Sequence, residues 1–275
     1  MAFWHRSHGL RSVDILIPNH NLGAVIELCI ESIRARTDYP NYSIIVHDES
    51  TQGTDRAYLE TAAAKGWTRL IRGNTRERWT TDRAKFSLGG HPAPYWHGCA
   101  LNVLINEVCQ ADLAMILDGD VFIKDPSWLN KMVDFIDDKI LVAAHWRPPS
   151  RFPSGACVPG WWRPHFLMLN MTAYLDGMEV DWRGGSVPMD SEPYRTIFAP
   201  LAAKEGFAIS GQTVCFDPGS SLWIKMQTDN PRHYHGCIIP DEMEKCYHHV
   251  SHGSLRQLRE DERELVKTEL ATLRA

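Results

Sequence analysis

Two aspartates placed one residue apart, Asp118 and Asp120, are the side chains of this sequence best suited to chemistry. They follow the apolar run at residues 113–117 and enclose Gly119, which permits tight backbone geometry close to a ligand. Mg2+ and Mn2+ prefer oxygen ligands, and Mg2+ is commonly held by one or two carboxylates together with substrate phosphates. The Asp-Gly-Asp turn therefore predicts a divalent cation site. A solvated turn is the alternative interpretation, which the buried strand in front of it makes weaker.

Three histidines near the end of the chain, His248, His249 and His252, form a second cluster. In an extended strand neighbouring side chains point to opposite faces, so His248 and His249 cannot both reach one metal ion. Taken alone, the cluster is as typical of surface or hydrogen-bonded core histidines as of a metal site.

Strands and helices alternate through the first 145 residues and position the acidic turn. Short apolar runs predict strands over residues 13–17, 43–46, 67–71, 113–117 and 140–144, and helical spacing predicts helices over 22–36, 54–66 and 101–108. This alternation predicts a mostly parallel Rossmann-like α/β sheet with helices on both faces. Ligands of such sheets bind outside the carboxyl ends of the strands. We therefore expect the polar clusters at 18–21, 47–51 and 118–120 to converge on one crevice.

The second half of the chain has more prolines and fewer periodic apolar runs in its first part. The proline-rich stretch 145–165 predicts a loop, and short apolar runs predict strands over 165–170, 207–209 and 237–239. A helix is expected to open at 222–226, and a charged helix is expected over 255–273. The whole chain is expected to form one domain with an irregular C-terminal half.

The composition excludes several classes of protein. The chain has 275 residues, is 44% hydrophobic and carries a formal net charge of −5, so it is neither disordered nor coated with basic residues. Seven cysteines without a CxxC pair argue against a disulfide framework or a structural zinc site, and favour buried reduced thiols in a cytosolic protein. The N-terminus has no apolar signal-peptide segment, and no run approaches the ~20 residues of a membrane helix. We therefore expect a cytoplasmic protein without an integral membrane segment.

Four segments resemble the family-2-type glycosyltransferases, which have the GT-A nucleotide-sugar fold. They are VDILIPNHN (13–21), SIIVHDESTQGT (43–54), HGCALNVLINEVCQADLAMILDGDVFI (97–123) and YHHVSHGS (247–254), in the family's order. The resemblance is good over residues 13–145 and loose beyond. It implies a nucleotide-sugar-binding half (13–145), an acceptor-binding half (146–254) and a C-terminal helix (255–275). His47, Glu49 and a long insertion at about 75–96 depart from the family's pattern.

The resemblance also implies roles for individual residues. Asp120 matches the direct metal ligand, Asp118 matches an aspartate at the ribose and the metal, and His249 or His252 matches a late histidine that completes the metal shell. Further nucleotide-binding residues implied in this way are Pro18, Asn19, Asn21, Asp48, Ser50 and Asn102. The implied cofactor is Mn2+ or Mg2+. The implied activity is transfer of a hexose from a nucleotide-diphospho-sugar, with a UDP-sugar favoured.

An inverting transferase needs a carboxylate that takes the proton of the acceptor hydroxyl. Asp217, Asp190 and Asp181 are candidates in the second half, and Asp217 is favoured because it follows an apolar run. The sequence Asp-Pro-Gly-Ser is equally typical of a helix N-cap.

Arginines and aromatic residues are interleaved in two stretches and predict an acceptor groove, because arginine binds phosphate and aromatic rings stack on bases or sugars. A solvated face and a packed loop are the plainer alternative. The candidate acceptor-binding residues are Arg76, Arg78, Trp146, Arg147, Trp161 and Trp162.

The favoured acceptor is a glycan or a lipid-linked sugar, and a hydroxylated base in DNA is the alternative, which would have to be unstacked into the site. A nucleotidyltransferase would usually carry a glycine-rich basic loop after the first strand, which is missing here. A non-catalytic nucleotide-sugar-binding module is the third class.

Overall fold

The computed structural model describes residues 10–51, 53–73, 92–151, 157–183, 185–216, 218–250 and 258–275. Within them, seven strands form the central sheet in the order β12-β6-β9-β4-β1-β2-β3. Their bounds are β1 Val13–Asn19, β2 Tyr42–Asp48, β3 Arg69–Arg72, β4 Leu113–Leu117, β6 Ile140–Arg147, β9 Trp161–Asn170 and β12 His235–Ile238. Only β9 runs against its neighbours β4 and β6, and the other pairs are parallel. The predicted mostly parallel α/β fold is confirmed.

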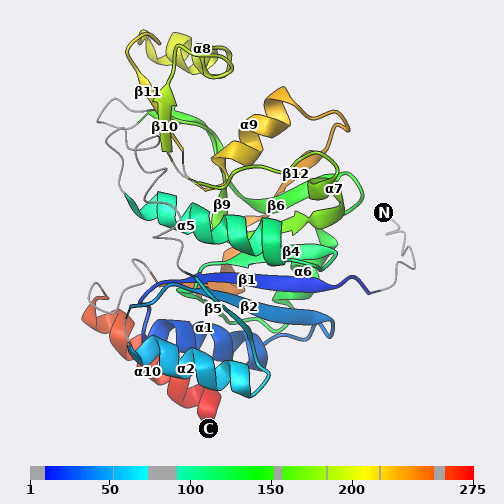
Figure 1. Ribbon diagram of the computed structural model, residues 1–275, viewed down its shortest axis with the longest axis vertical. Helices are drawn as coiled ribbons and strands as arrows, with labels where there is room; N and C mark the ends of the chain where they lie inside the picture. Colours follow the sequence, from blue (N-terminus) through cyan, green and yellow to red (C-terminus); the bar gives the residue numbers. More distant parts are fainter. Residues whose placement is uncertain are drawn as a thin grey trace.

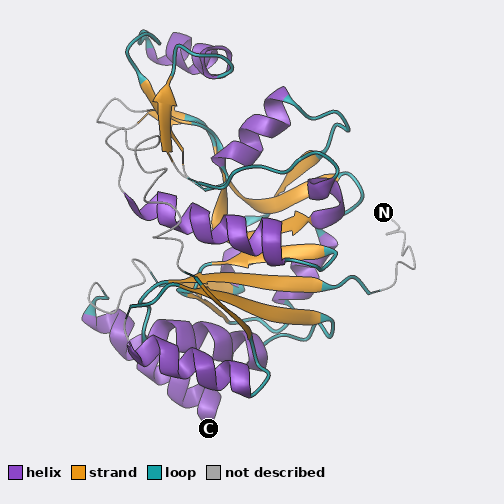
Figure 2. Cartoon of the chain, viewed as in Figure 1, coloured by secondary structure: helices purple, strands orange, loops and turns teal. Residues whose placement is uncertain are grey.

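Helices cover both faces of this sheet (Figures 1 and 2). Their bounds are α1 Ala24–Ala35, α2 Gly53–Ala64, α5 Pro92–Asn102, α6 Trp128–Asp134, α7 Met171–Leu175, α8 Tyr194–Glu205, α9 Ser220–Thr228 and α10 Glu260–Arg274. A π-helical turn, η1 (Val103–Val108), extends α5, and a short 3-10 turn, η2 (Asp241–Lys245), precedes the last strand. No helix in the described part of the chain is both long enough and apolar enough to cross a membrane.

The alternation of side chains along β1 divides the core into two layers. Ile15 and Ile17 pack with Ile26 of α1 in one cluster, whereas Leu16 packs with Leu104 and other residues of the α5–η1 face in a second cluster. A strand covered on both faces reads as a continuous apolar run. This is why residues 13–17 are apolar except at Asp14, whose carboxylate accepts hydrogen bonds from the amides of Gln110 and Ala111.

Two smaller sheets complete the structure. One has the order β10-β11-β8-β7 and extends with α8 away from the central sheet, at the top of Figure 1. Its strands are β7 Ser150–Arg151, β8 Cys157–Val158, β10 Gly185–Pro188 and β11 Thr213–Phe216. The other pairs β5 (Val121–Ile123) with β13 (Tyr247–His249) in antiparallel register, so that His249 lies opposite Val121.

Two predictions for the second half are wrong. The stretch 145–165 is not a plain loop, because β6 continues to Arg147, β7 and β8 follow, and β9 begins at Trp161. Pro148, Pro149 and Pro159 lie outside these strands, and Pro164 lies in β9. Residues 207–209 form no strand, and they follow the end of α8 as a turn. There Phe207 packs its side chain against a small apolar cluster, which explains the apolar run.

The other helices and strands predicted for the second half are present in the structure, but their first and last residues differ from the predicted ones. The helix expected over 255–273 begins at Glu260, and residues 251–257 lie outside the described part. The expected functional boundary between residues 145 and 146 falls inside β6. All seven cysteines are free, and four of them are buried.

Candidate functional site

The acidic turn lies where β4 ends. Asp118 follows β4 directly, and the turn leads through Asp120 into β5. Gly119 packs against the end of β1 and the start of α1, because a Cβ there would come within 2.5 Å of Leu22 Cδ1 and 3.3 Å of the Pro18 carbonyl oxygen. The glycine therefore lets the turn sit closely against the polar segment that follows β1.

β13 brings a histidine to this turn. The amide of Val250 donates to the Asp120 carbonyl at 2.9 Å, and His249 Nε2 lies 3.2 Å from Asp120 Oδ1. His248 points the other way and its ring lies 5.2 Å from that of Phe122. The prediction that the two histidines face opposite sides is confirmed. His252 lies outside the described residues.

One ligand atom from each of Asp118, Asp120 and His249 lies within 4.8 Å of the other two. The Oδ1 atoms of both aspartates are buried and accept no hydrogen bond of regular geometry from the described residues. Two half-buried carboxylates side by side, each with one buried oxygen, are costly unless a cation or proton compensates them. Two oxygens and one imidazole nitrogen are a donor set that Mn2+ and Mg2+ accept, so these three residues fit such a cation.

Two further histidines, which the sequence reasoning missed, surround the acidic turn. His97 of α5 places Nε2 at 3.1 Å from Asp118 Oδ1. His165 of β9 stacks on His249 with ring centroids 4.8 Å apart and parallel planes, and its Nε2 lies 3.4 Å from the Tyr247 hydroxyl. The signal was present for His97, which opens the HGCALN segment that carries the resemblance. His165 had no signal beyond its place at the start of an expected strand.

The histidines and carboxylates shift one another's pKa. Burial raises the pKa of Asp118, but the imidazoles of His97, His165 and His249 outweigh it and hold this pKa below its ordinary value. Burial and the nearby Asp118 charge raise the pKa of Asp120 despite its contact with His249. Burial is also the main reason why the pKa of His165 falls to about 4, so its ring is neutral near pH 7. Burial lowers the pKa of His249, but its contact with Asp120 prevails and raises it.

The polar turns after β1 and β2 meet, as the sequence predicts. Asn19 Nδ2 donates to Asp48 Oδ1 and to Ser50 Oγ, both at 2.9 Å. Ser50 Oγ also accepts from the amide of Asn21, which has a positive φ of 55°. Pro18 is half-buried within β1, at register with His47. Four of the predicted nucleotide-binding residues, Asp48 among them, thus lie in one hydrogen-bond network.

Asp48 holds this network rather than facing an opening. Its side chain has no exposed surface, and Oδ2 lies 2.8 Å from Arg72 Nη1. A direct contact between Asp48 and a base would therefore require Arg72 to move aside. Asn102 is also engaged elsewhere, because its side chain donates to Asp181 at 2.7 Å and accepts from the amide of Trp182 at 2.9 Å.

Two of the candidate catalytic carboxylates, Asp181 and Asp190, make no hydrogen bond or ion pair with the acidic turn within the described part of the chain. Asp190 is exposed in the turn that follows β10. Asp181 is held by Asn102 and forms an ion pair with Arg183. Asp217 lies outside the described residues.

Tryptophans of the predicted acceptor groove do come together. Trp146 lies 4.9 Å from Trp162 and 5.7 Å from Trp223, measured between ring centroids. They line a cavity of about 350 Å3 under α9, beside β12. A Cβ at Gly236 would come within 2.0 Å of the Trp162 ring, so this glycine makes room for the indole. Trp223 was not predicted, because it sits within an ordinary helical segment.

The other predicted acceptor residues contribute little here. Arg147 is exposed at the end of β6, and Trp161 begins β9 at register with it. Arg76 and Arg78 lie outside the described residues, as do the remaining positions of 74–91. Arg72, at the start of the same basic stretch, is tied to Asp48 and Glu60.

Known proteins match this chain in structure and not in sequence. No protein-family profile matches the sequence, and no curated protein matches it. Among solved structures, the mannosyltransferase PcManGT from Pyrobaculum calidifontis in complex with GDP-Man and Mn2+ aligns over 76% of this chain and 57% of its own, with 18% identity and a TM-score of 0.42. TarS from S. aureus aligns over 81% of this chain and 41% of its own, with 13% identity and a TM-score of 0.43. The chain thus spans about half the length of these structures or less.

Proposed function

We propose that this protein is a metal-dependent glycosyltransferase that moves a sugar from a nucleotide-diphospho-sugar, with a UDP-sugar favoured, to an acceptor hydroxyl. The observation that carries the proposal is the half-buried carboxylate pair of Asp118 and Asp120, met by His249, at the carboxyl end of β4. Ligands of such sheets bind at this edge. The sequence resemblance of residues 13–145 to family-2-type enzymes agrees with this placement.

Asp118, Asp120 and His249 would hold Mn2+ or Mg2+. When bound, such a cation stabilises the negative charge on a diphosphate leaving group. His97 fixes the Asp118 carboxylate from the side of α5, and His165 stacks behind His249. Because His165 is neutral near pH 7, it leaves the net charge of the site unchanged while it orients its neighbour.

The network of Asn19, Asn21, Asp48 and Ser50 would form the wall against which the nucleotide lies. Its hydrogen bonds are already made in the protein, so the wall is rigid before the donor binds. Rigid donors and acceptors reduce the ordering cost of binding. Within this proposal, Asp217 is the favoured proton acceptor for the attacking hydroxyl and Asp190 the second choice.

The tryptophan-lined cavity beside β12 supports a sugar ring as part of the acceptor. Aromatic faces give apolar contact to flat ligands, while Gln227 in the cavity lining offers a polar group. We therefore favour a glycan or lipid-linked sugar as acceptor. A hydroxylated DNA base stays the alternative from sequence, because the arginines that favoured it, Arg76 and Arg78, are not described.

The test is a thermal-shift panel of UDP, GDP, CDP and dTDP, each with Mn2+ or with EDTA. A ligand at 100 times its Kd adds about 2.7 kcal/mol to the free energy of unfolding. We expect a Mn2+-dependent shift with UDP that is lost in Asp120→Asn and kept in Asp229→Asn. Asp229 is the matched control, because it is an exposed aspartate paired with Lys225 at 2.6 Å.

A turnover assay then separates the classes of function. Release of a nucleoside diphosphate from the donor supports a glycosyltransferase, and release of pyrophosphate identifies a nucleotidyltransferase. Nucleotide binding without turnover of any donor identifies a binding module. No shift with any nucleotide would show that the acidic turn is structural.

A further inference from the structure

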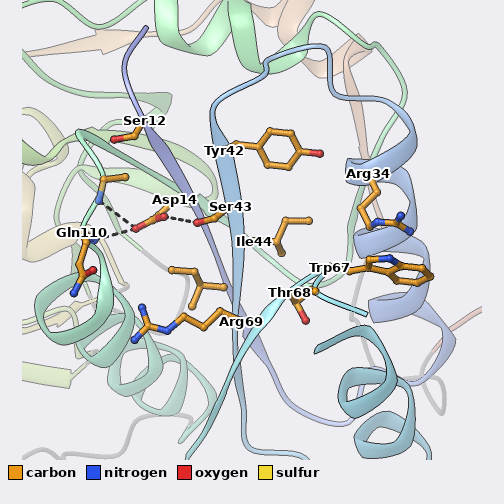
Figure 3. A pocket seen from close by; sticks show the side chains of 13 residues that line it. Ser12, Asp14, Arg34, Tyr42, Ser43, Ile44, Trp67, Thr68, Arg69 and Gln110 are labelled. Atoms are coloured by element: carbon orange, nitrogen blue, oxygen red, sulfur yellow. Dashed lines mark hydrogen bonds between the residues drawn. The ribbon is translucent and has the colours of Figure 1, made fainter. Parts of the chain in front are cut away.

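A second cavity, of about 700 Å3, lies at the opposite end of the central sheet, where its parallel strands begin (Figure 3). It exists because β3 is shorter than its neighbour. Arg69, the first residue of β3, pairs with Ile45, whereas β2 already begins at Tyr42. On the β3 side, residues 42–44 of β2 therefore have no strand partner among the described residues.

The cavity wraps around this open strand edge. In Figure 3, Asp14, Ser43, Gln110 and Arg69 lie on one side of β2, and Tyr42, Ile44, Arg34 and Trp67 lie on the other. This follows from the register, since side chains of a strand alternate between the two faces. A strand added along residues 42–44 would point its own side chains alternately into these two lobes.

The charge available to a ligand in the cavity is positive. Arg69 is exposed and has no ion pair with any described residue. The Cζ atom of Arg34 lies 3.6 Å from the centroid of the Trp67 ring. Arg34 also forms a partly exposed ion pair with Glu31, with 3.2 Å between Nη1 and Oε2. Lys65 flanks the same ring at 4.3 Å.

The single acidic residue that lines the cavity is already satisfied. Asp14 accepts hydrogen bonds from the amides of Gln110 at 2.9 Å and Ala111 at 3.2 Å, and from the Ser43 hydroxyl. Its charge is thereby compensated by the protein itself. By contrast, Thr68 Oγ1 is buried in the cavity wall without a hydrogen-bond partner in the described part of the chain.

We propose that the open edge of β2 at residues 42–44 binds an extended acidic peptide segment, which adds to the sheet as a strand. Main-chain hydrogen bonds give affinity in this mode, and pockets for alternate side chains give specificity. Arg69 in one lobe and Arg34 in the other select acidic side chains, while Tyr42 and Trp67 cover apolar ones. A second copy of this chain pairing through the same edge is disfavoured, because it would bring Arg34 and Arg69 against their own equivalents.

The test uses a fluorescein-labelled hexapeptide with blocked ends in which pairs of glutamates alternate with a pair of valines, so that each lobe receives acidic and apolar side chains, and binding is followed by fluorescence anisotropy at low salt. Its comparison peptide has the same sequence with alternate backbone nitrogens methylated, which removes strand pairing and keeps the charge. We expect methylation to weaken binding about tenfold or more, because several main-chain hydrogen bonds are lost. We expect Arg69→Glu to weaken it similarly and Arg195→Glu, on α8, to leave it unchanged.

Three results would overturn the proposal. Equal binding of the methylated peptide would identify a plain anion site instead of an added strand. Absence of binding at about 1 mM peptide would exclude even a weak site. Concentration-dependent dimers of the free protein that Arg69→Glu strengthens would show that the edge pairs with a second copy. The cavity lies at the opposite end of the strands from Asp120, so Asp120→Asn, which tests the proposed transferase activity, is expected to leave peptide binding intact.

Discussion

Replacement of Asp120 by asparagine should stabilise the metal-free protein while it abolishes the response to Mn2+. Asp118 and Asp120 place carboxylate oxygens within 4.8 Å of each other in a buried turn. At an effective dielectric constant of about 20, two unit charges at this distance repel by about 3 kcal/mol. Asparagine keeps the shape and an acceptor oxygen for His249 but removes the repulsion.

Part of this repulsion is screened, because the two side chains keep some exposed surface. We therefore expect a gain of about 1–3 kcal/mol in the free energy of unfolding, or roughly 2–8 °C in Tm. The measurement is thermal unfolding in EDTA at about pH 9, where an ordinary histidine is neutral. With saturating Mn2+ the order should reverse, since only the unchanged protein gains binding energy.

Asp229→Asn is the control for the loss of a carboxylate and should change neither curve by more than ~0.5 kcal/mol. The reasoning is refuted if Asp120→Asn is less stable than the unchanged protein in EDTA. It is also refuted if both proteins gain equally from Mn2+, because the cation would then bind elsewhere.

The pKa of His165 is about 4 in the folded protein, whereas an ordinary histidine has a pKa of about 6.5. The free energy of unfolding in EDTA, measured with urea, should therefore fall by up to about 3 kcal/mol between pH 6.5 and pH 4. The unfolded chain takes up this proton first, so His165→Phe should flatten the slope, and an unchanged slope would contradict the assignment. Gly98→Ala should lower stability by about 1–3 kcal/mol, because its Cβ would lie 2.2 Å from the Trp182 carbonyl oxygen. Gly53→Ala, with open space around it, is the matched control, and equal melting temperatures would refute the packing argument. Trp223→Ala should raise the KM for a sugar acceptor and leave donor hydrolysis unchanged in a steady-state assay, whereas a matching loss in both would place Trp223 in the general fold.

The first half of the fold could be predicted because its signals are local. Four of the five residues at 13–17 are apolar since β1 is covered on both faces, and the polar residues after this run mark where the strand ends. β9 was predicted only in its second half, because Pro164 and the glycines around it argue for a loop while pairing with β6 overrides them. The apolar run at 207–209 predicts a strand equally well, yet it packs as a turn on α8.

The site could be predicted in part for the same reason. Asp118 and Asp120 carry their own signal in their spacing. His97 has a signal only through the HGCALN segment that it opens, and His165 has none, because the contacts of these two residues with Asp118 and His249 depend on how α5 and β9 pack. Asp48 was expected to face a base, but its pairing with Arg72 depends on a strand that lies more than twenty residues away.

The reversed strand β9 has a consequence for how the chain acquires its shape during synthesis. β4 and β6 lie on either side of β9, so neither is completed before residues 161–170 are made. Until then the nascent chain exposes the apolar edge of β4, whose residues are all buried in the finished protein. Exposed strand edges and late non-local pairing slow folding and invite aggregation. We therefore expect the yield of folded protein to depend on translation speed and on chaperones. This dependence should be stronger while residues 118–170 are being made than during synthesis of any other part of the sheet.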